Sequence, residues 1–477
     1  MTSVAGAARS VGVDGDGGPA TRGGAGSGPV VLRIHPVRGE GHRYYTDDLV
    51  PGRAEGSRVA GESPGVWTGG GAATLGLDGT VHPEAFRQVL EGLDPRSGDR
   101  MRRLHGGRTV SGFDLTFCAP KSVSLLHLLA PTEIAAQAGA GHHAAVEEAT
   151  DYLAQAAVGV RRQRDGVVGL LPATGPVAGH FVHRTSRALD PHLHSHLVVA
   201  NVAQGVDGHW SALDSRRLFA HAPTVQAVYH ARLRLELTTR LGAAWQVPPS
   251  GLGDVVGVDA RLRRLFSTRS ASMDEYDHAR NRVGRGAGRS RGGFHATRPD
   301  KDRSHTVEGL TGQWRTRASD FGIDLGDLTR TVGLGRRSGA AGGPPFDPER
   351  IGAHLSGLAE RGRPVLPHQL VAAVAVSTSR GATVGQIESV AAGIAGACRN
   401  VGRTSEPRWS AADVLRAVGD RPELLVPSEQ HGLDRRGRDV EPASVRSSAR
   451  ERPTGRATAL DVEAGFPPRE LGHDLGR

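Results

Sequence analysis

The sequence predicts an α+β fold with low-complexity ends, and three observations lead to this prediction. Residues 113–118 alternate strictly between apolar and polar side chains, which is the pattern of a half-buried strand. Residues 141–162 and 224–241 instead repeat their apolar side chains at helical spacing. The 477 residues include 67 glycines and 28 prolines, and both ends are low in complexity, so the folded part is smaller than the length implies.

Shifts in composition divide the chain into five parts. We expect a disordered N-terminal extension at residues 1–29, where glycine, alanine and serine dominate without periodicity. A main domain is predicted at residues 30–334, followed by a Gly/Pro-rich linker at residues 335–348. Residues 349–425 predict a small, mostly helical region, and the polar residues 426–477 predict a disordered tail.

Strands and helices are predicted in turn through the first half of the main domain. The run Val30–Val37 is rich in β-branched residues and predicts the first strand. Helical spacing of apolar residues predicts a helix from His82 to Gly92. The alternating strand of residues 111–118 leads into a helix with Pro120 near its first turn, where no backbone donor is needed. The long helix of residues 141–162 follows.

A histidine-rich hairpin is predicted in the second half of the main domain. Residues 179–185 and 192–200 predict two strands, with residues 189–191 as the turn or the strand entry. Further helices are predicted at residues 224–241, 308–321 and 410–418, the last with Ser410 as its N-cap.

The histidines of this hairpin predict a metal site. His192, His194 and His196 occupy alternate positions, so their imidazoles point to one face of the strand. Pairing of the two strands would bring His183 beside His194 and His196. A single histidine on a strand is usually a packed or solvated side chain, but an aligned set on a rigid sheet suits a divalent metal.

Two further features can serve the same chemistry. Asp114 lies on the polar face of the strand at residues 111–118, where its carboxylate can orient a histidine or accept a proton. Tyr44 and Tyr45 follow the first strand, and a tyrosine hydroxyl can attack phosphorus. Because the ordinary pKa of that hydroxyl is about 10, the attack needs help from a metal or a base.

The net charge of +9 permits a polyanionic partner, nucleic acid first. Lys121 and Lys301 are the chain's two lysines, so the positive charge is nearly all arginine. This skew is also typical of GC-rich coding sequence, and many arginines are expected to be solvated surface residues. Cys118 and Cys398 are far apart in sequence and predict neither a disulfide framework nor a zinc ribbon.

Neither a membrane or secretory segment nor a nucleotide-binding P-loop is recognisable in the sequence. No apolar run has transmembrane length and no secretory signal is recognisable, so we expect a cytoplasmic protein without membrane insertion. A P-loop needs a lysine after a glycine, but Lys121 follows Pro120 and Lys301 follows Asp300. We therefore expect no nucleotide cofactor.

Three motifs together resemble those of the conjugative relaxases of the MobF (TrwC/TraI) class. Residues 112–124 (GFDLTFCAPKSVS) are similar to the second motif of the family. Residues 183–196 (HRTSRALDPHLHSH) are similar to its third motif, a three-histidine metal site. Tyr44 and Tyr45 are similar to its nucleophile motif, and the three motifs occur in the family's order over roughly residues 30–328.

The resemblance implies both a fold and an activity. The fold is of the HUH type, a central antiparallel sheet flanked by helices, with the metal and the tyrosine on one face. The activity is nicking and joining of one DNA strand at an origin of transfer through a covalent 5′-phosphotyrosine, which initiates conjugation or mobilisation of a plasmid or integrative element. The implied cofactor is a divalent metal ion, Mg²⁺ or Mn²⁺, which polarises the scissile phosphate.

The same resemblance assigns the site residues. Tyr44, the first of its pair, matches the nucleophile best, with Tyr45 as the alternative, and Asp114 matches the motif carboxylate that we expect to orient a histidine. The metal ligands are expected to be His183, His194 and His196. His192 is left outside this set, as a strand residue nearer the rim of the site.

Contacts with DNA phosphates are expected from Lys121, Arg184, Arg187 and Lys301, each of which can equally be a solvated surface charge. The chain lacks the second tyrosine pair that several relaxases carry downstream of the first. The larger relatives fuse a helicase, for which we find no motif here, so we expect either a partner protein that separates the strands or a truncated or accessory relaxase. The expected partners are therefore single-stranded DNA at an origin of transfer, a separate helicase and a coupling protein.

Three other functions remain open at this stage. The first is a rolling-circle replication or transposition initiator, which shares the histidine, metal and tyrosine chemistry. The second is a metal-dependent phosphodiesterase that hydrolyses DNA without a covalent step. The third is a non-catalytic DNA-binding relative of the relaxases.

Overall fold

A computed structural model gives the fold of the chain. The structure describes residues 32–38, 64–102, 109–248, 251–269, 271–272, 275, 306–337, 346–402, 406–427, 433–434 and 438–439. The predicted tyrosines Tyr44 and Tyr45, Lys301, the extension at residues 1–29 and nearly all of the tail lie outside these described residues. The chain forms two compact units, residues 1–440 and 441–477, and the fold below is that of the first.

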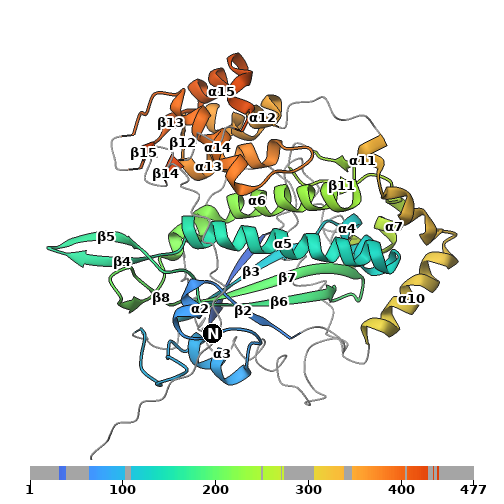
Figure 1. Cartoon of the computed structure of the whole chain (residues 1–477), viewed down its shortest axis with the longest axis horizontal. Coiled ribbons are helices and arrows are strands. Elements are labelled where there is room, and N and C mark those ends of the chain that lie inside the picture. The colour runs from blue at the N-terminus through green and yellow to red at the C-terminus, as the bar shows by residue number, and fades with distance from the viewer. Residues whose placement is uncertain are drawn as a thin grey trace, which may run out of the picture. The chain divides into compact units, whose positions relative to one another are not determined.

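A five-stranded antiparallel sheet forms the centre of the fold (Figure 1). The strand order is β1-β3-β7-β6-β2. The strands are β1 (Arg33–Arg38), β3 (Val110–Cys118), β7 (Pro191–Ala200), β6 (Ala178–Thr185) and β2 (Val66–Thr68). The α+β prediction and the central antiparallel sheet are both confirmed, and the predicted histidine hairpin is the pair β6–β7.

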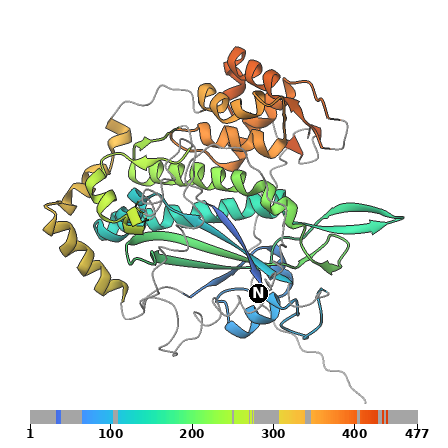
Figure 2. The same cartoon turned by 180° about the vertical axis from the view of Figure 1, so that it is seen from behind.

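One face of the sheet packs on helices. Phe113, Leu115 and Phe117 alternate along β3 and are at most 2% exposed, as is Leu197 on β7. They pack in one apolar cluster with residues of three helices, which lie on one side of the sheet in both views (Figures 1 and 2). These helices are α4 (Lys121–Leu129), α5 (Thr132–Ala156) and α6 (Ser215–Leu241).

Among the described residues, helices cover only one end of the opposite face, and the rest is its uncovered part. Phe86 on α3 packs its ring 5.5 Å from that of Phe181 on β6 and 5.9 Å from that of Trp67 on β2. Val198 and Ala200, at the end of β7, belong to the same apolar cluster. The covering helices are α2 (Gly70–Thr74) and α3 (Pro83–Leu90), the latter close to the predicted helix.

One predicted helix was wrong at both ends. Helix α5 begins at Thr132 rather than residue 141, and it ends at Ala156 rather than residue 162. Residues 159–164 instead form strand β4 (Gly159–Arg164), paired with β5 (Val167–Pro172) in a ribbon that projects from the sheet (Figure 1). The physical reason is the Asp165-Gly166 turn, in which φ is 51° and 78°. Two positive φ angles define the type I′ turn that favours a hairpin over a helix.

The helix after the hairpin starts earlier than predicted. Helix α6 begins at Ser215 rather than near residue 224, because the Asp214 side chain accepts the Arg216 backbone N–H and Pro223 is accommodated inside the helix. Helix α10 (Val307–Asp320) agrees with the prediction to one residue at each end. The short elements between them are β8 (Ala203–Gln204), β9 (Trp210–Ser211), β10 (Trp245–Gln246), β11 (Asp254–Val255) and α7 (Ala260–Leu265).

The C-terminal region is mostly helical, as predicted, and packs on α6. Arg234 of α6 is 1% exposed and donates to the carbonyls of Gly251 (2.7 Å) and Ala375 (3.2 Å) and to Thr378 Oγ1 (3.0 Å). Gly381, with φ of +88°, approaches the α6 backbone so closely that a Cβ would lie 2.1 Å from the Leu235 nitrogen. The elements are η2 (Leu325–Thr331), α11 (Leu334–Arg337), α12 (Pro348–Ala359), β12 (Pro364–Val365), α13 (Pro367–Ser377), α14 (Val384–Gly396), β13 (Trp409–Ser410), α15 (Ala411–Asp420), η3 (Pro422–Leu425), β14 (Leu433–Asp434) and β15 (Arg438–Asp439).

The five-part division of the chain stays a prediction. Ala227 and Ala231 of α6, in the predicted main domain, belong to the apolar cluster of the C-terminal region, so these two predicted parts share a core. Ser410 is the N-cap of α15, as predicted, although its side chain makes no capping hydrogen bond. Among the described residues, no helix is both long enough and apolar enough to cross a membrane.

Candidate active site

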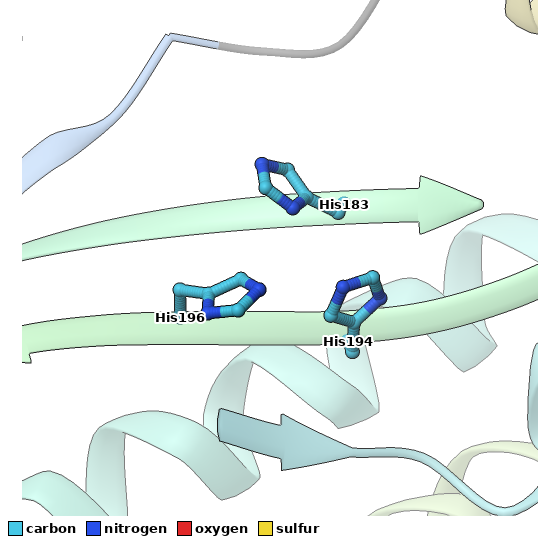
Figure 3. A group of neighbouring side chains, drawn as sticks. All are labelled: His183, His194 and His196. Carbon is cyan, nitrogen blue, oxygen red and sulfur yellow. The ribbon is translucent and has the colours of Figure 1, made fainter. Parts of the chain in front are cut away.

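Three histidines meet on the uncovered part of the sheet. His183 comes from β6, and His194 and His196 come from β7 (Figure 3). One nitrogen of each ring lies within 4.8 Å of the others, and the ring centroids are 5.3, 5.1 and 5.2 Å apart. The three rings therefore form a nearly equilateral triangle, the shape that a single metal ion requires of three ligands.

The strand pairing explains why these side chains meet. His183 is paired directly with His194 across the β6–β7 hairpin. Along β7 the side chains of Leu193, Ser195 and Leu197 are buried toward the helices, so the intervening histidines face the other way. In the part of the chain that the structure describes, this is the one group of three or more histidine, cysteine or acidic side chains close enough to hold a metal.

Hydrogen bonds orient two of the three rings. His196 Nδ1 lies 2.8 Å from Asp114 Oδ1 and 3.0 Å from Oδ2, on the neighbouring strand β3. His194 Nδ1 lies 3.0 Å from the backbone carbonyl of His192. Because both partners accept, each Nδ1 carries the proton and donates, so that the lone pair of each ring is on Nε2. This is the tautomer that a metal ligand needs.

Burial keeps the His194 ring neutral. It lowers the pKa of His194 to about 3, and the neighbouring His196 acts in the same direction. The pKa of His192 is also well below its usual range because of burial. A neutral imidazole binds metal, whereas an imidazolium cannot, so His194 is ready to bind a metal at neutral pH.

His192 lies closer to the site than expected. Its ring stacks on that of His194, with centroids 4.7 Å apart and planes 26° from parallel. It is not part of the three-histidine group, in agreement with its exclusion, but its carbonyl orients His194.

A buried polar chain lies on the other side of β7 and was missed in the sequence. His142 of α5 places Nε2 2.9 Å from Ser195 Oγ and Nδ1 2.8 Å from the Tyr229 hydroxyl. All three residues are at most 1% exposed. The signal was Ser195 itself, since a polar residue on the apolar face of an alternating strand needs a buried partner.

The predicted DNA-contacting residues are dispersed around the hairpin. Lys121 directs its Nζ to the Pro191 carbonyl at 2.6 Å. Arg184, at the end of β6, and Arg187, in the turn, are half-buried. Lys301 lies outside the described residues, as do Tyr44 and Tyr45. Strand β1, which precedes the tyrosines in the chain, runs beside β3, with His35 paired to Asp114.

The chain matches a known protein family. The profile described as TrwC relaxase matches residues 37–321. Two similar curated proteins are multifunctional conjugation proteins TraI, from Escherichia coli and from its strain K12. They are 32% identical over 247 residues and 33% identical over 258 residues, or 50% and 51% of this chain. The matched parts cover only 13% and 14% of those much longer relatives.

Solved structures of similar fold are relaxases with DNA. One is the conjugative relaxase TrwC in complex with OriT DNA in a metal-bound structure, with 29% identity and a TM-score of 0.55. Another is TrwC complexed with a 27-mer DNA comprising the recognition hairpin and the cleavage site, with 29% identity and a TM-score of 0.53. Each comparison covers 62% of this chain and 99% of the other.

Proposed function

This chain belongs to the TrwC relaxase family, and from that premise we propose that it nicks and rejoins one DNA strand at an origin of transfer. The observation that carries the proposal is the triangle of His183, His194 and His196, with Asp114 hydrogen-bonded to His196. Asp114 is in turn paired with His35 of β1, the strand that precedes Tyr44 and Tyr45 in the chain. Similar relaxases have been solved with OriT DNA, which supports the choice of substrate.

The proposed nucleophile is Tyr44, with Tyr45 as the alternative. Its hydroxyl oxygen attacks the scissile phosphorus, a P–O bond to tyrosine forms, and the bond to the 3′ oxygen breaks. The 3′ oxygen takes up a proton, and the 5′ phosphate stays on the tyrosine. The reverse reaction consumes the phosphotyrosine and restores the strand, so joining needs no ATP.

The histidine triangle fits a divalent metal ion. Each ring offers one nitrogen, His194 is held neutral by burial, and the Nδ1 atoms of His194 and His196 are engaged by acceptors. When bound, such an ion polarises the scissile phosphate and offsets the charge that develops on its oxygens. We propose Mg²⁺ or Mn²⁺. Imidazole donors prefer transition metals, so Mn²⁺ is expected to bind more tightly than Mg²⁺.

Asp114 acts in this proposal as a positioning residue. Both of its oxygens lie within 3.0 Å of His196 Nδ1, and its side chain is 5% exposed. A carboxylate in that place orients the ring and strengthens its other nitrogen as a ligand. The role of proton acceptor for the tyrosine is therefore the less favoured one.

The proposed partners follow from the reaction. They are single-stranded DNA at the origin of transfer, a helicase and a coupling protein, and the proposed location is the cytoplasm. Arg184, Arg187 and Lys301 are proposed contacts to DNA phosphates, whose neutralisation would make binding weaken with added salt.

The proposal is tested by incubating the protein with a single-stranded origin oligonucleotide and Mn²⁺, then separating the products on a denaturing gel. The wild type is expected to yield protein-linked DNA, and Tyr44→Phe is expected to lose it. Tyr45→Phe is the matched control and should retain it. If Tyr44→Phe and Tyr45→Phe both cleave DNA and no variant yields an adduct, the enzyme is a hydrolytic phosphodiesterase.

A substrate comparison addresses the rolling-circle alternative. Origin-of-transfer and replication-origin oligonucleotides of the same element would be offered in competition. Cleavage that strongly prefers the replication origin would contradict the proposed function.

A further inference from the structure

We propose that Lys121 and Ser124, at the start of helix α4, position the metal-binding end of β7 instead of contacting DNA. The inference rests on the metal site of the proposed function. Both residues belong to the motif at residues 112–124, and β7 belongs to the motif at residues 183–196. The proposal therefore gives a physical reason why these two motifs work together.

The ladder between β6 and β7 is irregular beside the metal ligands. Regular pairing runs up to His183 with His194, and the next pair is Thr185 with Pro191. One residue of β6 thus lies opposite two residues of β7, which is a β-bulge. The sheet alone does not hold the segment from Pro191 to Leu193, because a bulge leaves its extra residue outside the ladder.

Helix α4 supplies partners for this bulged segment. Lys121 Nζ donates to the Pro191 carbonyl at 2.6 Å. The Leu193 N–H donates to Ser124 Oγ at 3.1 Å, and the Leu193 carbonyl accepts from the Ala119 N–H at 3.0 Å. Both backbone groups of Leu193, the residue before His194, are therefore satisfied: the N–H by Ser124 of α4, and the carbonyl by Ala119, the residue that follows β3.

The turn before the bulge is anchored as well. Asp190 is 2% exposed, and its carboxylate accepts from the Thr268 N–H at 2.9 Å and from Thr268 Oγ1 at 3.0 Å. The indole N–H of Trp314 donates to the carbonyl of Leu189 at 2.8 Å. Leu189 itself has φ of 57°, a conformation that a leucine adopts only when its surroundings enforce it.

The surroundings of the Lys121 ammonium favour a role inside the protein over a contact at its surface. Burial lowers the pKa of its ammonium to about 8, and the nearby Asp190 opposes that shift. The ammonium is directed to a backbone carbonyl of β7. A lysine that binds a DNA phosphate is ordinarily exposed and hydrated, because its contribution to DNA affinity comes from the release of counterions at the surface.

The consequence concerns His194. Its ring must stay within reach of a metal held at the same time by His183 and His196. A shift of the bulged segment would move His194 relative to both, and metal sites lose affinity when supporting contacts are lost.

The sharpest test compares two serines of the same helix. Ser124 and Ser122 are both 0% exposed, and each accepts one backbone N–H through its hydroxyl. Ser124 accepts from Leu193 of β7, whereas Ser122 accepts from Val255, outside the hairpin. Mn²⁺ titration of the metal-free full-length protein should show about tenfold weaker binding for Ser124→Ala. Ser122→Ala should bind like the wild type. Equal losses in both variants would mean general destabilisation and would overturn the proposal.

Lys121→Met separates the two roles of the lysine. We expect weaker Mn²⁺ binding with unchanged salt dependence of single-stranded DNA binding. The opposite result, unchanged Mn²⁺ binding with a salt slope lower by about 0.7, would make Lys121 a phosphate contact. His194→Ala is measured alongside. If it also binds Mn²⁺ normally, the metal site of the proposed function fails; if it alone loses Mn²⁺, only the positioning role is overturned.

Discussion

Strand β7 presents two different surfaces on one face of the same sheet. His194 and His196 lie at its uncovered part, whereas Val198 and Ala200 lie under helix α3 in an apolar cluster. The side chains follow one alternation, so backbone geometry does not distinguish the two ends. Among the described residues the difference lies in the cover: where α3 packs on β7 the face is core, and beyond α3 the three histidines gather.

The covered end should be the more costly to disturb. Phe86→Ala removes the ring that packs between Trp67 and Phe181, and we expect a loss of about 3–5 kcal/mol in the free energy of unfolding. Thermal or denaturant unfolding measures this loss. Mn²⁺ affinity of the protein that remains folded should be unchanged; a large drop would show that the two ends are not independent.

The uncovered end should show the reverse pattern. His194→Ala is expected to reduce nicking by on the order of 10²–10³-fold, because metal polarisation of a phosphate contributes several kcal/mol. The unfolding temperature should change less than in Phe86→Ala, since His194 lies on the opposite face of β7 from Leu193 and Leu197 of the main apolar cluster. DNA affinity, measured by fluorescence anisotropy without metal, should be retained. Parallel loss of DNA binding and of the fold would remove support for the metal-site assignment.

Asp114→Asn should have a smaller effect at the same end. The amide keeps the size of the carboxylate but can present its NH₂ group to His196 Nδ1, which favours the wrong tautomer. We expect metal affinity to fall about 10–100-fold with little change in stability. Unchanged metal affinity combined with lost nicking would instead favour Asp114 as a base for the tyrosine.

Mild acid should produce the smallest effect, and buried histidines on both faces of the sheet should contribute to it. Burial lowers the pKa of His180 to about 4 and that of His230 to about 3. Both folded values lie below the unfolded value of about 6.5, so the unfolded chain binds protons first and stability falls as the pH drops below about 6.5. Unfolding temperatures between about pH 7.5 and 6 should decline slightly, and more steeply below. Stability that rises on acidification would contradict these burial effects.

The sequence predicted which residues lie together in the candidate site, but it did not predict the contacts that hold them in place. Alternation in β3 and β7 correctly put Asp114, His194 and His196 on one face, and the predicted hairpin correctly paired His183 with His194. The contact of Asp114 with His196 spans 82 positions, and the sequence offered Asp114 as a carboxylate that can orient a histidine without naming which one. The β4–β5 ribbon was missed, although Asp165-Gly166 is a strong hairpin signal, because the preceding helical spacing was extended too far.

Local periodicity determined the α+β class, the histidine hairpin and the direction of its imidazoles. These depend on neighbours two to four residues apart, which any window of the sequence contains. Only the tertiary structure decided that Lys121 faces Pro191, that His142 meets Ser195, and where α3 leaves the sheet uncovered. Those contacts join residues far apart in the chain, and they form only when packing brings buried polar groups to the partners they require.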